Sequence, residues 1–366
     1  MNDKSTNPFP MGDCGDFKIF LPPEDMNEAL AMKRVSDFNA RNIEFIRNFT
    51  LPEKRTRIRT SFVYAHPADY RGRPMLGAST ADWCGALQEL KGKGIDSVIF
   101  QSALWRELEE CFYMSNEFKS MKRDPVIEHL LEAAEIENIK VYLGGYGSVA
   151  GWSKSFSEEQ LKKEISEHTR CFDELKNFTS VAGFYFPGET AYRDGRLPEK
   201  EKRMNCLYRR FVDLVKSHDS NLVVISSPAT MHRLENTEEF KDFWNAILEN
   251  CGLDILMPQD CIGNACSHLA ELDGQWKAWK EIVSNHNIKL WSHTEIFERR
   301  SYMNEVNLYP CHPDRVAVQL ALTAPYVSNH ACWEMHYFAN PVSGPEGARL
   351  DEYFRSLQDQ IKFIAR

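Results

Sequence analysis

Two glutamates close apolar runs in which a carboxyl group could do acid–base chemistry. Glu189 ends GFYFPGE (183–189), just past a Pro-Gly turn, and Glu295 lies near the end of IKLWSHTEIF (288–297). Trp291 and His293 precede Glu295 by four and two residues, so a strand would present all three on one face. Two carboxyl groups that face each other are what most enzymes that cleave glycosidic bonds use.

The distance between two such carboxyl groups decides the stereochemistry of cleavage. Retention needs them about 5–5.5 Å apart, and inversion needs about 6.5–9.5 Å. Both routes remain open from the sequence. The aromatic approach to Glu189, made by Phe184, Tyr185 and Phe186, predicts a pKa raised by desolvation, as an acid at neutral pH requires.

The elements that must position these residues alternate between short apolar runs and amphipathic segments. Strands followed by helices imply parallel pairing with right-handed crossovers, and eight such units predict an α/β fold, a single closed (β/α)8 TIM barrel. An open doubly wound sheet is the competitor, but no GxGxxG or P-loop follows the first strand. The eight predicted strands are 58–66, 96–104, 139–147, 180–189, 221–229, 253–260, 288–297 and 324–338.

Helix-start signals and the composition of the chain set the expected boundaries of the helices and domains. Ser157 with Gln160, and Asn236 with Glu239, have capping-box spacing at two helix starts. We expect residues 1–57 to form a partly helical N-terminal extension that packs on the barrel, which itself takes 58–366. No Pro/Gly/Ser-rich linker divides the chain.

Active sites of such barrels form at the C-terminal ends of the strands. The strand ends of this chain carry mostly acids, amides, imidazoles and aromatic rings, a mixture suited to sugar hydroxyls and to the apolar faces of sugar rings. We therefore predict eight residues that bind substrate around Glu189 and Glu295: His66, Gln101, Tyr146, Gln259, Asp260, His293, Trp333 and Glu334.

Composition and net charge limit the classes of molecule that the protein is expected to bind. The net charge is −9, which argues against nucleic acid, and the basic run at 54–59 leads directly into an apolar strand. No apolar stretch is long enough to span a bilayer, and no signal peptide is visible, so we expect a cytoplasmic protein with a carbohydrate partner. The 10 cysteines contain no CxxC pair and read as core residues in a reducing compartment. We predict no cofactor and no metal.

Three segments carry a resemblance to a known family. In order, GFYFPGE (183–189), DILMPQDCIG (254–263) and LWSHTEIF (289–297) resemble the motifs of an uncharacterised bacterial family of glycoside-hydrolase-like (β/α)8 barrels, a domain of unknown function. The resemblance runs from about residue 58 to 340, and the P-Q-D-x-x-G element is its most specific part. It implies a relation to the large clan of retaining glycosidases, with Glu189 as acid/base and Glu295 as nucleophile.

One position departs from that clan. Gly188 stands where the clan usually has an asparagine that binds the sugar 2-hydroxyl, so we expect Gln259 or Asp260 to supply this contact. Two alternatives to a glycosidase remain. A metal-dependent sugar isomerase or lyase would use His293, Glu295, Asp260 and Glu189 as ligands. A carbohydrate-binding barrel without catalysis would use the acids only as hydrogen-bond acceptors.

Overall fold

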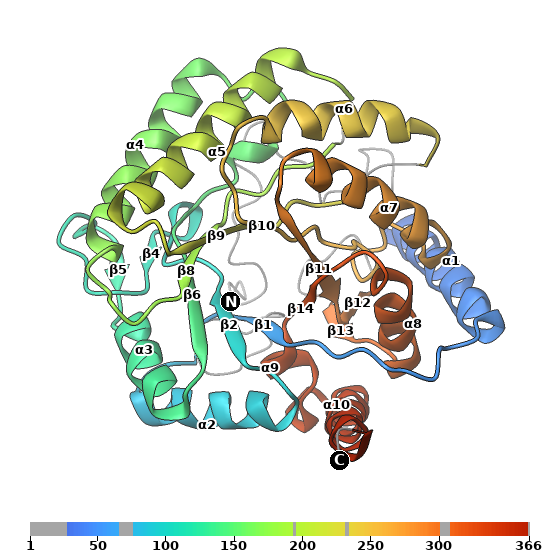
Figure 1. Ribbon diagram of the computed structural model, residues 1–366. Coiled ribbons are helices and arrows are strands. Elements are labelled where there is room, and N and C mark those ends of the chain that lie inside the picture. The colour runs from blue at the N-terminus through green and yellow to red at the C-terminus, as the bar shows by residue number, and fades with distance from the viewer. Residues whose placement is uncertain (1–27, 66–75, 193–194, 231–233, 301–307, 365–366) are drawn as a thin grey trace.

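A closed ring of eight parallel strands forms the centre of the computed structural model, and helices surround it (Figure 1). The structure describes residues 28–65, 76–192, 195–230, 234–300 and 308–364. The strands follow the order β1-β14-β11-β10-β9-β8-β6-β2 around the barrel, which confirms the predicted fold and all eight predicted strands. They are β1 (Thr60–Val63), β2 (Ser97–Phe100), β6 (Lys140–Gly144), β8 (Gly183–Phe186), β9 (Val223–Ser226), β10 (Ile255–Leu256), β11 (Lys289–Glu295) and β14 (Asn329–Trp333).

Each barrel strand is followed by a helix that covers the outside of the ring. This order, strand then helix, is what forces the neighbouring strands to run parallel. The helices are α2 (Thr80–Gly92), α3 (Val126–Glu137), α4 (Glu158–Leu175), α5 (Pro198–His218), α6 (Thr237–Leu248), α7 (Leu269–Asn285), α8 (Pro313–Thr323), the short α9 (Met335–Phe338) and α10 (Pro345–Ile364).

Within the described loops, the structure has two small sheets and four short 3-10 helices. One sheet has the order β5-β4-β3-β7, and a hairpin pairs β12 with β13. Their bounds are β3 (Leu104–Trp105), β4 (Glu110–Cys111), β5 (Lys122–Arg123), β7 (Tyr146–Gly147), β12 (Phe297–Arg299) and β13 (Leu308–Pro310), and the 3-10 helices are η1 (Arg106–Leu108), η2 (Ala150–Trp152), η3 (Leu234–Asn236) and η4 (Pro341–Ser343).

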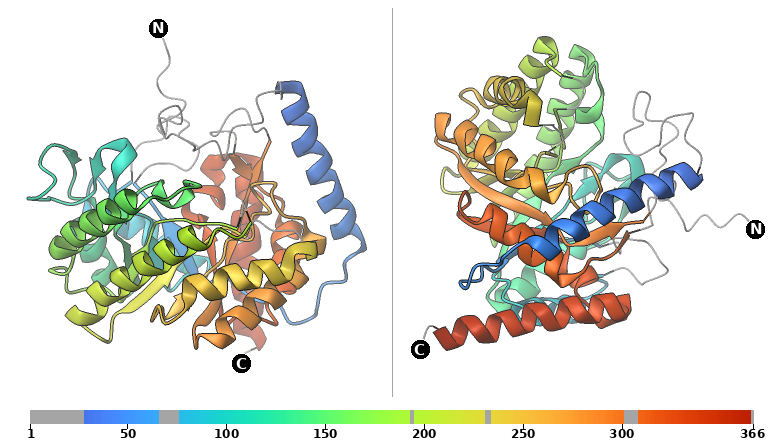
Figure 2. Two further views of the ribbon diagram at one scale, coloured as in Figure 1. Left: turned by 90° about the horizontal axis from the view of Figure 1, so that it is seen from above. Right: turned by 90° about the vertical axis from the view of Figure 1, so that its right-hand side faces the viewer.

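The N-terminal helix α1 (Glu28–Asn48) lies outside the helix ring, against α7 and α8 (Figure 1, Figure 2). The ring of Phe38 stacks on His268 at 3.9 Å, and the Asn39 amide donates to the backbone oxygen of Arg299 at 3.4 Å. The Asn42 side chain accepts the N–H of Leu269, the first residue of α7. The helical part of the extension therefore packs on the barrel.

The two predicted capping boxes had different outcomes. Ser157 and Gln160 form one at the start of α4, each accepting the other's backbone N–H. The prediction for Asn236 and Glu239 was wrong, since the Asn236 side chain caps nothing. A carboxylate oxygen of Glu239 accepts the N–H of Arg196 instead, because the chain before α5 passes close by.

Strand alternation divides the core into two layers. Along β8, Phe184 and Phe186 face outward and meet the rings of Phe172 on α4 and Phe211 on α5 at 5.1 and 5.2 Å. Tyr185 between them faces inward, where its ring meets Phe62 of β1 edge to face. The barrel interior is filled by Phe62, Ile99, Tyr142, Tyr185, Ile225, Ile255, Met257 and Ala331.

Candidate active site

Glu189 lies at the C-terminal end of the barrel, three residues beyond β8. Its Oε1 accepts a hydrogen bond of 2.9 Å from the Gln259 side-chain amide. Desolvation of the carboxyl group raises the pKa of Glu189 to about 7, although the Gln259 bond acts in the opposite direction. Glu189 can thus hold a proton near neutral pH, which is the direction that the sequence predicted, although Phe184 and Phe186 face the outer layer.

Packing explains the glycine before Glu189. A Cβ atom on Gly188 would come within 2.6 Å of the Phe186 ring, which is buried among Tyr208, Phe211 and His168. An asparagine at this position would displace the aromatic cluster that anchors β8 to its helices. Gln259 instead brings an amide to Glu189 from β10's side of the ring.

Glu295 is the last residue of β11 and is buried. Its Oε2 accepts the backbone N–H of Asn264 at 2.7 Å. Burial and the neighbouring Asp260 raise the pKa of Glu295, whereas the Asn264 bond and the guanidinium groups of Arg315 and Arg299 act to lower it. On the same strand, His293 and Trp291 face the barrel interior, which confirms that these three side chains share a face.

One segment, Gln259 to Asn264, donates hydrogen bonds to the carboxyl groups of both glutamates. Its first residue donates to Glu189 and its last donates, through the backbone, to Glu295. Gly263 lies so close to Glu295 that an added Cβ would sit 3.0 Å from the Glu295 Cβ and 2.3 Å from the Phe297 oxygen. The segment overlaps the P-Q-D-x-x-G motif (258–263) and ends one residue beyond it, so this most specific motif lies between the two acids.

Asp260 faces the protein rather than open space. Its Oδ1 accepts the N–H groups of Ile262 and Glu295, and its Oδ2 accepts from the Gln319 amide at 2.6 Å. Burial raises the pKa of Asp260, and these donors together with Arg315 oppose the rise. The site thus contains a third carboxyl group that is fully engaged by backbone and α8.

His293 brings an imidazole into the same region. Its Nδ1 is 2.8 Å from the Ser227 hydroxyl, and its ring stacks on Phe62 at 4.6 Å. Burial lowers its pKa to about 3, so the ring is neutral. Among the described residues its Nε2 is buried and has no hydrogen-bond partner, which leaves one polar atom for a bound molecule.

Gln101 and Trp333 lie together at the same end of the barrel. The indole Nε1 of Trp333 donates to the Gln101 Oε1 at 3.2 Å, although the two residues are 232 apart in sequence. Both are half-buried, and the Trp333 ring packs against Phe297 and Phe338. An amide and an indole are thereby held next to each other.

The other predicted binding residues are placed differently. Tyr146 packs in the outer layer against His168 of α4, so the structure does not bring it together with the two glutamates. Glu334 is buried at the start of α9. His66 lies outside the described residues and remains a prediction.

Sequence reasoning missed the residues that support the acids. Asn264 follows the P-Q-D-x-x-G motif, and Arg299 donates two hydrogen bonds to its side-chain oxygen. Arg315 and Gln319 are buried on α8 and reach the Glu295 backbone. The signal that could have found them is a polar pair four residues apart within the apolar stretch RVAVQLAL.

Several other findings bear on the predictions. Among residues 28–364, apart from the gaps stated above, no group of three His, Cys, Asp or Glu side chains is arranged to hold a metal ion. None of the cysteines in the described part of the chain forms a disulfide. No helix in the same described residues is long and apolar enough to cross a membrane.

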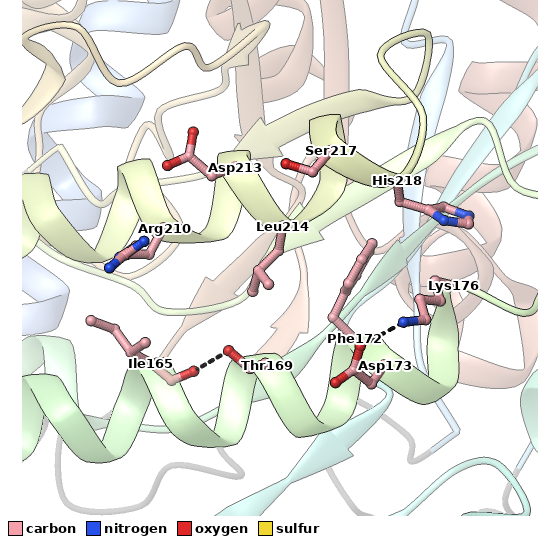
Figure 3. A pocket seen from close by; sticks show the side chains of 10 residues that line it. All are labelled: Ile165, Thr169, Phe172, Asp173, Lys176, Arg210, Asp213, Leu214, Ser217 and His218. Atoms are coloured by element: carbon pink, nitrogen blue, oxygen red, sulfur yellow. Dashed lines mark hydrogen bonds and ion pairs between the residues drawn. The ribbon is translucent and has the colours of Figure 1, made fainter.

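An open groove of about 590 Å³ lies on the outer helix layer (Figure 3). Ile165, Phe172 and Leu214 give it apolar walls, and charged side chains such as Lys176 and Arg210 also line it. All of its lining comes from α4, its C-terminal cap and α5, so the groove is separate from the strand ends that carry Glu189 and Glu295.

Solved structures share the fold. A "putative alpha-L-fucosidase" from Bacteroides thetaiotaomicron VPI-5482 matches with a TM-score of 0.68 and 19% identity, over 84% of this chain and 97% of that one. A beta-galactosidase from Marinomonas ef1 matches with a TM-score of 0.55 and 10% identity, over 84% of this chain and 60% of that one. A GH113 beta-1,4-mannanase matches with a TM-score of 0.52 and 13% identity, over 82% of this chain and 98% of that one.

Sequence comparison shows the family. No curated protein sequence matches the chain. One family model does match, over residues 75–344, which is well over half of the chain and includes all three motifs of the resemblance. The protein belongs to the family described as a domain of unknown function, DUF4434.

Proposed function

We propose that this protein is a glycoside hydrolase in which Glu189 is the general acid/base and Glu295 the nucleophile. The observation that carries the proposal is the segment from Gln259 to Asn264, which donates one hydrogen bond to each carboxyl group at the C-terminal end of the barrel. Structural neighbours with this fold include enzymes named for cleaving galactosides and mannans, which supports a carbohydrate substrate.

The two carboxyl groups differ in the groups that surround them. The Glu189 carboxyl accepts one side-chain amide, and its pKa of about 7 leaves it protonated in part at neutral pH, ready to protonate a leaving oxygen. Glu295 accepts a backbone N–H and lies near two guanidinium groups, which oppose the rise in its pKa that burial and Asp260 cause. Ionised Glu295 would attack the anomeric carbon, and water activated by Glu189 would then release the sugar.

The polar and aromatic groups nearby suit a sugar. We infer that Gln259, Gln101 and the Nε2 atom of His293 bind hydroxyl groups, and that Trp333 stacks on the apolar face of a ring. The neutral imidazole offers a hydrogen bond without placing a positive charge next to the developing oxocarbenium ion.

The test is turnover of activated aryl glycosides by the Glu189→Gln and Glu295→Gln variants. We expect each to lose at least about 10³-fold in kcat/KM, because each removes a group that acts in the transition state. Glu298→Gln, which changes a half-buried glutamate on the neighbouring β12, is the matched control and should retain activity. Unchanged turnover in either site variant would refute its role.

Two further readouts separate the alternatives. Proton NMR of the first-formed product distinguishes retention from inversion. Binding of glycans without turnover in the wild type would favour a carbohydrate-binding barrel, and loss of activity with a chelator would favour the metal-dependent reaction.

A further inference from the structure

Asp260 is enclosed by donors from three elements. Its two carboxylate oxygens accept three hydrogen bonds, from the backbone of Ile262, the backbone of Glu295 and the side chain of Gln319. Only 1% of the residue is exposed. A carboxylate with this many donors is held in one orientation and has little capacity left for sugar hydroxyls.

Helix α8 completes the enclosure. Arg315 Nε donates to the Gln319 Oε1 at 3.2 Å, which turns the Gln319 amide so that its nitrogen points at Asp260. Arg315 also donates to the backbone oxygen of Glu295 at 2.8 Å, and Gln319 donates to the same oxygen at 3.3 Å. Asp260 thus accepts a hydrogen bond from the backbone N–H of Glu295, and two side chains of α8 donate to the backbone oxygen of Glu295.

We propose that Asp260 is a positioning residue, which fixes the main chain of Glu295 and keeps a negative charge beside its carboxyl group rather than binding substrate. This inference rests on the proposed function of Glu295 and revises the substrate-binding role that the sequence suggested for Asp260. The charge makes Glu295 a stronger base, because a second carboxylate nearby disfavours a second negative charge.

In the described part of the chain, charged and titratable groups from several elements act on the pair. Arg315 from α8 and Arg299 from β12 lie close enough to act on Glu295, and the thiols of Cys261 and Cys311 lie near the two acids. Burial raises the pKa of both thiols, so they are neutral at the pH of the experiment. Asp260 is thus an anionic neighbour whose removal should change the titration of Glu295.

The experiment follows the protonation of Glu295 directly. The protein is labelled with 13C-glutamate, its carboxyl signals are followed by NMR from pH 4 to 10, and Glu295→Gln identifies the Glu295 signal. In Asp260→Asn we expect the pKa of Glu295 to fall by about one unit or more, since the neighbouring charge is gone while the acceptor for both N–H groups remains. The acid limb of kcat/KM should move down by the same amount.

Controls distinguish this inference from others. Asp314→Asn removes an exposed charge from the first turn of the same helix α8 and should leave both readouts unchanged. An unshifted Glu295 titration in Asp260→Asn, or a change confined to KM, would overturn the positioning role. If the wild type cleaves no glycoside, the proposed function fails while the NMR titration still decides the role of Asp260.

A reciprocal measurement covers the case in which Asp260→Asn does not fold. Coupling between two titrating groups acts equally in both directions. With 13C-aspartate labelling, Glu295→Gln should therefore lower the pKa of Asp260 relative to the wild type. An Asp260 signal that titrates identically in both proteins would also overturn the inference.

Discussion

At the scale of single residues, the site depends on how closely the main chain can approach Glu295. Gly263 lies against the Glu295 side chain and the Phe297 backbone oxygen, and the next residue, Asn264, donates its N–H to the carboxylate. Arg299 in turn holds the Asn264 side chain with two hydrogen bonds of 3.0 and 2.8 Å. A side chain at position 263 would push the Asn264 N–H away from the Glu295 carboxylate.

Gly263→Ala is therefore expected to reduce activity without unfolding the barrel. The added methyl group would have to displace Glu295 or the 263–264 backbone, and a displacement near 1 Å costs about 10²-fold in rate. Kinetics on aryl glycosides, with circular dichroism to verify the fold, measures this. The control is Gly145→Ala directly after β6, where the new Cβ meets only a Phe211 ring carbon at 3.6 Å. Equal activities in the two variants would contradict the argument.

At the scale of elements, α4 buries polar groups against the barrel. Glu164 of α4 is 3% exposed, and its Oε2 accepts from the Ser148 hydroxyl at 2.7 Å. Arg106 is 4.0 Å from its Oε1, too far to offset the loss of hydration. Burial therefore raises the pKa of Glu164 to about 7, so the folded state favours the protonated form.

This shift predicts how stability depends on pH. Because the folded-state pKa lies above the ordinary value of 4.5, stability from the protonated carboxyl is present below pH 4.5 and is lost as the pH rises to 7. Glu164→Gln keeps the acceptor for Ser148 and removes the charge. We expect it to raise the free energy of unfolding by about 1–3 kcal/mol at pH 8 and to change it little at pH 4.5.

Urea unfolding at the two pH values measures the effect. Glu167→Gln on the next turn of α4 serves as the control, since Glu167 is partly exposed and paired with Arg170. A gain of equal size at both pH values would show that the charge of Glu164 is not its origin.

At the scale of the whole molecule, the barrel closes where the last strand pairs with the first. Lys93, just after α2, reinforces this closure from a fully buried position. Its ammonium group donates to Glu89 at 2.6 Å and to the Ala339 oxygen at 2.5 Å, and it pairs with Asp351 of α10 at 3.1 Å. The first helix of the barrel, the loop beyond β14 and the last helix thus meet at one side chain.

Lys93→Met should destabilise the protein by about 3–5 kcal/mol, because it leaves carboxylates partly buried without their cation. The free energy of unfolding in urea, measured at pH 7, is the readout. Lys91→Met removes an exposed lysine two residues earlier that pairs with Glu137, and it should cost less than about 1 kcal/mol. Similar losses in the two variants would mean that the buried cluster contributes little to closure.

The sequence by itself determined the fold and the strand-end position of each acid. Eight alternations of strand and helix suffice for this because parallel pairing and handedness leave few topologies, and because strand ends converge at one mouth. Because side chains alternate along a strand with a period of two, the sequence also predicted which residues of β11 face the barrel interior. Tyr146 was expected among the binding residues, but periodicity near a strand end does not fix which layer a side chain enters.

Only the tertiary structure decided which polar groups of the site meet one another. Gln259 meets Glu189, Trp333 meets Gln101 and Gln319 meets Asp260 across 70, 232 and 59 residues of sequence. No local pattern encodes such contacts, since they depend on how the strands order around the ring and on how α8 packs beneath the 259–264 segment. The same packing decides the role of Asp260, because three fixed donors turn a carboxylate at a strand end away from the mouth.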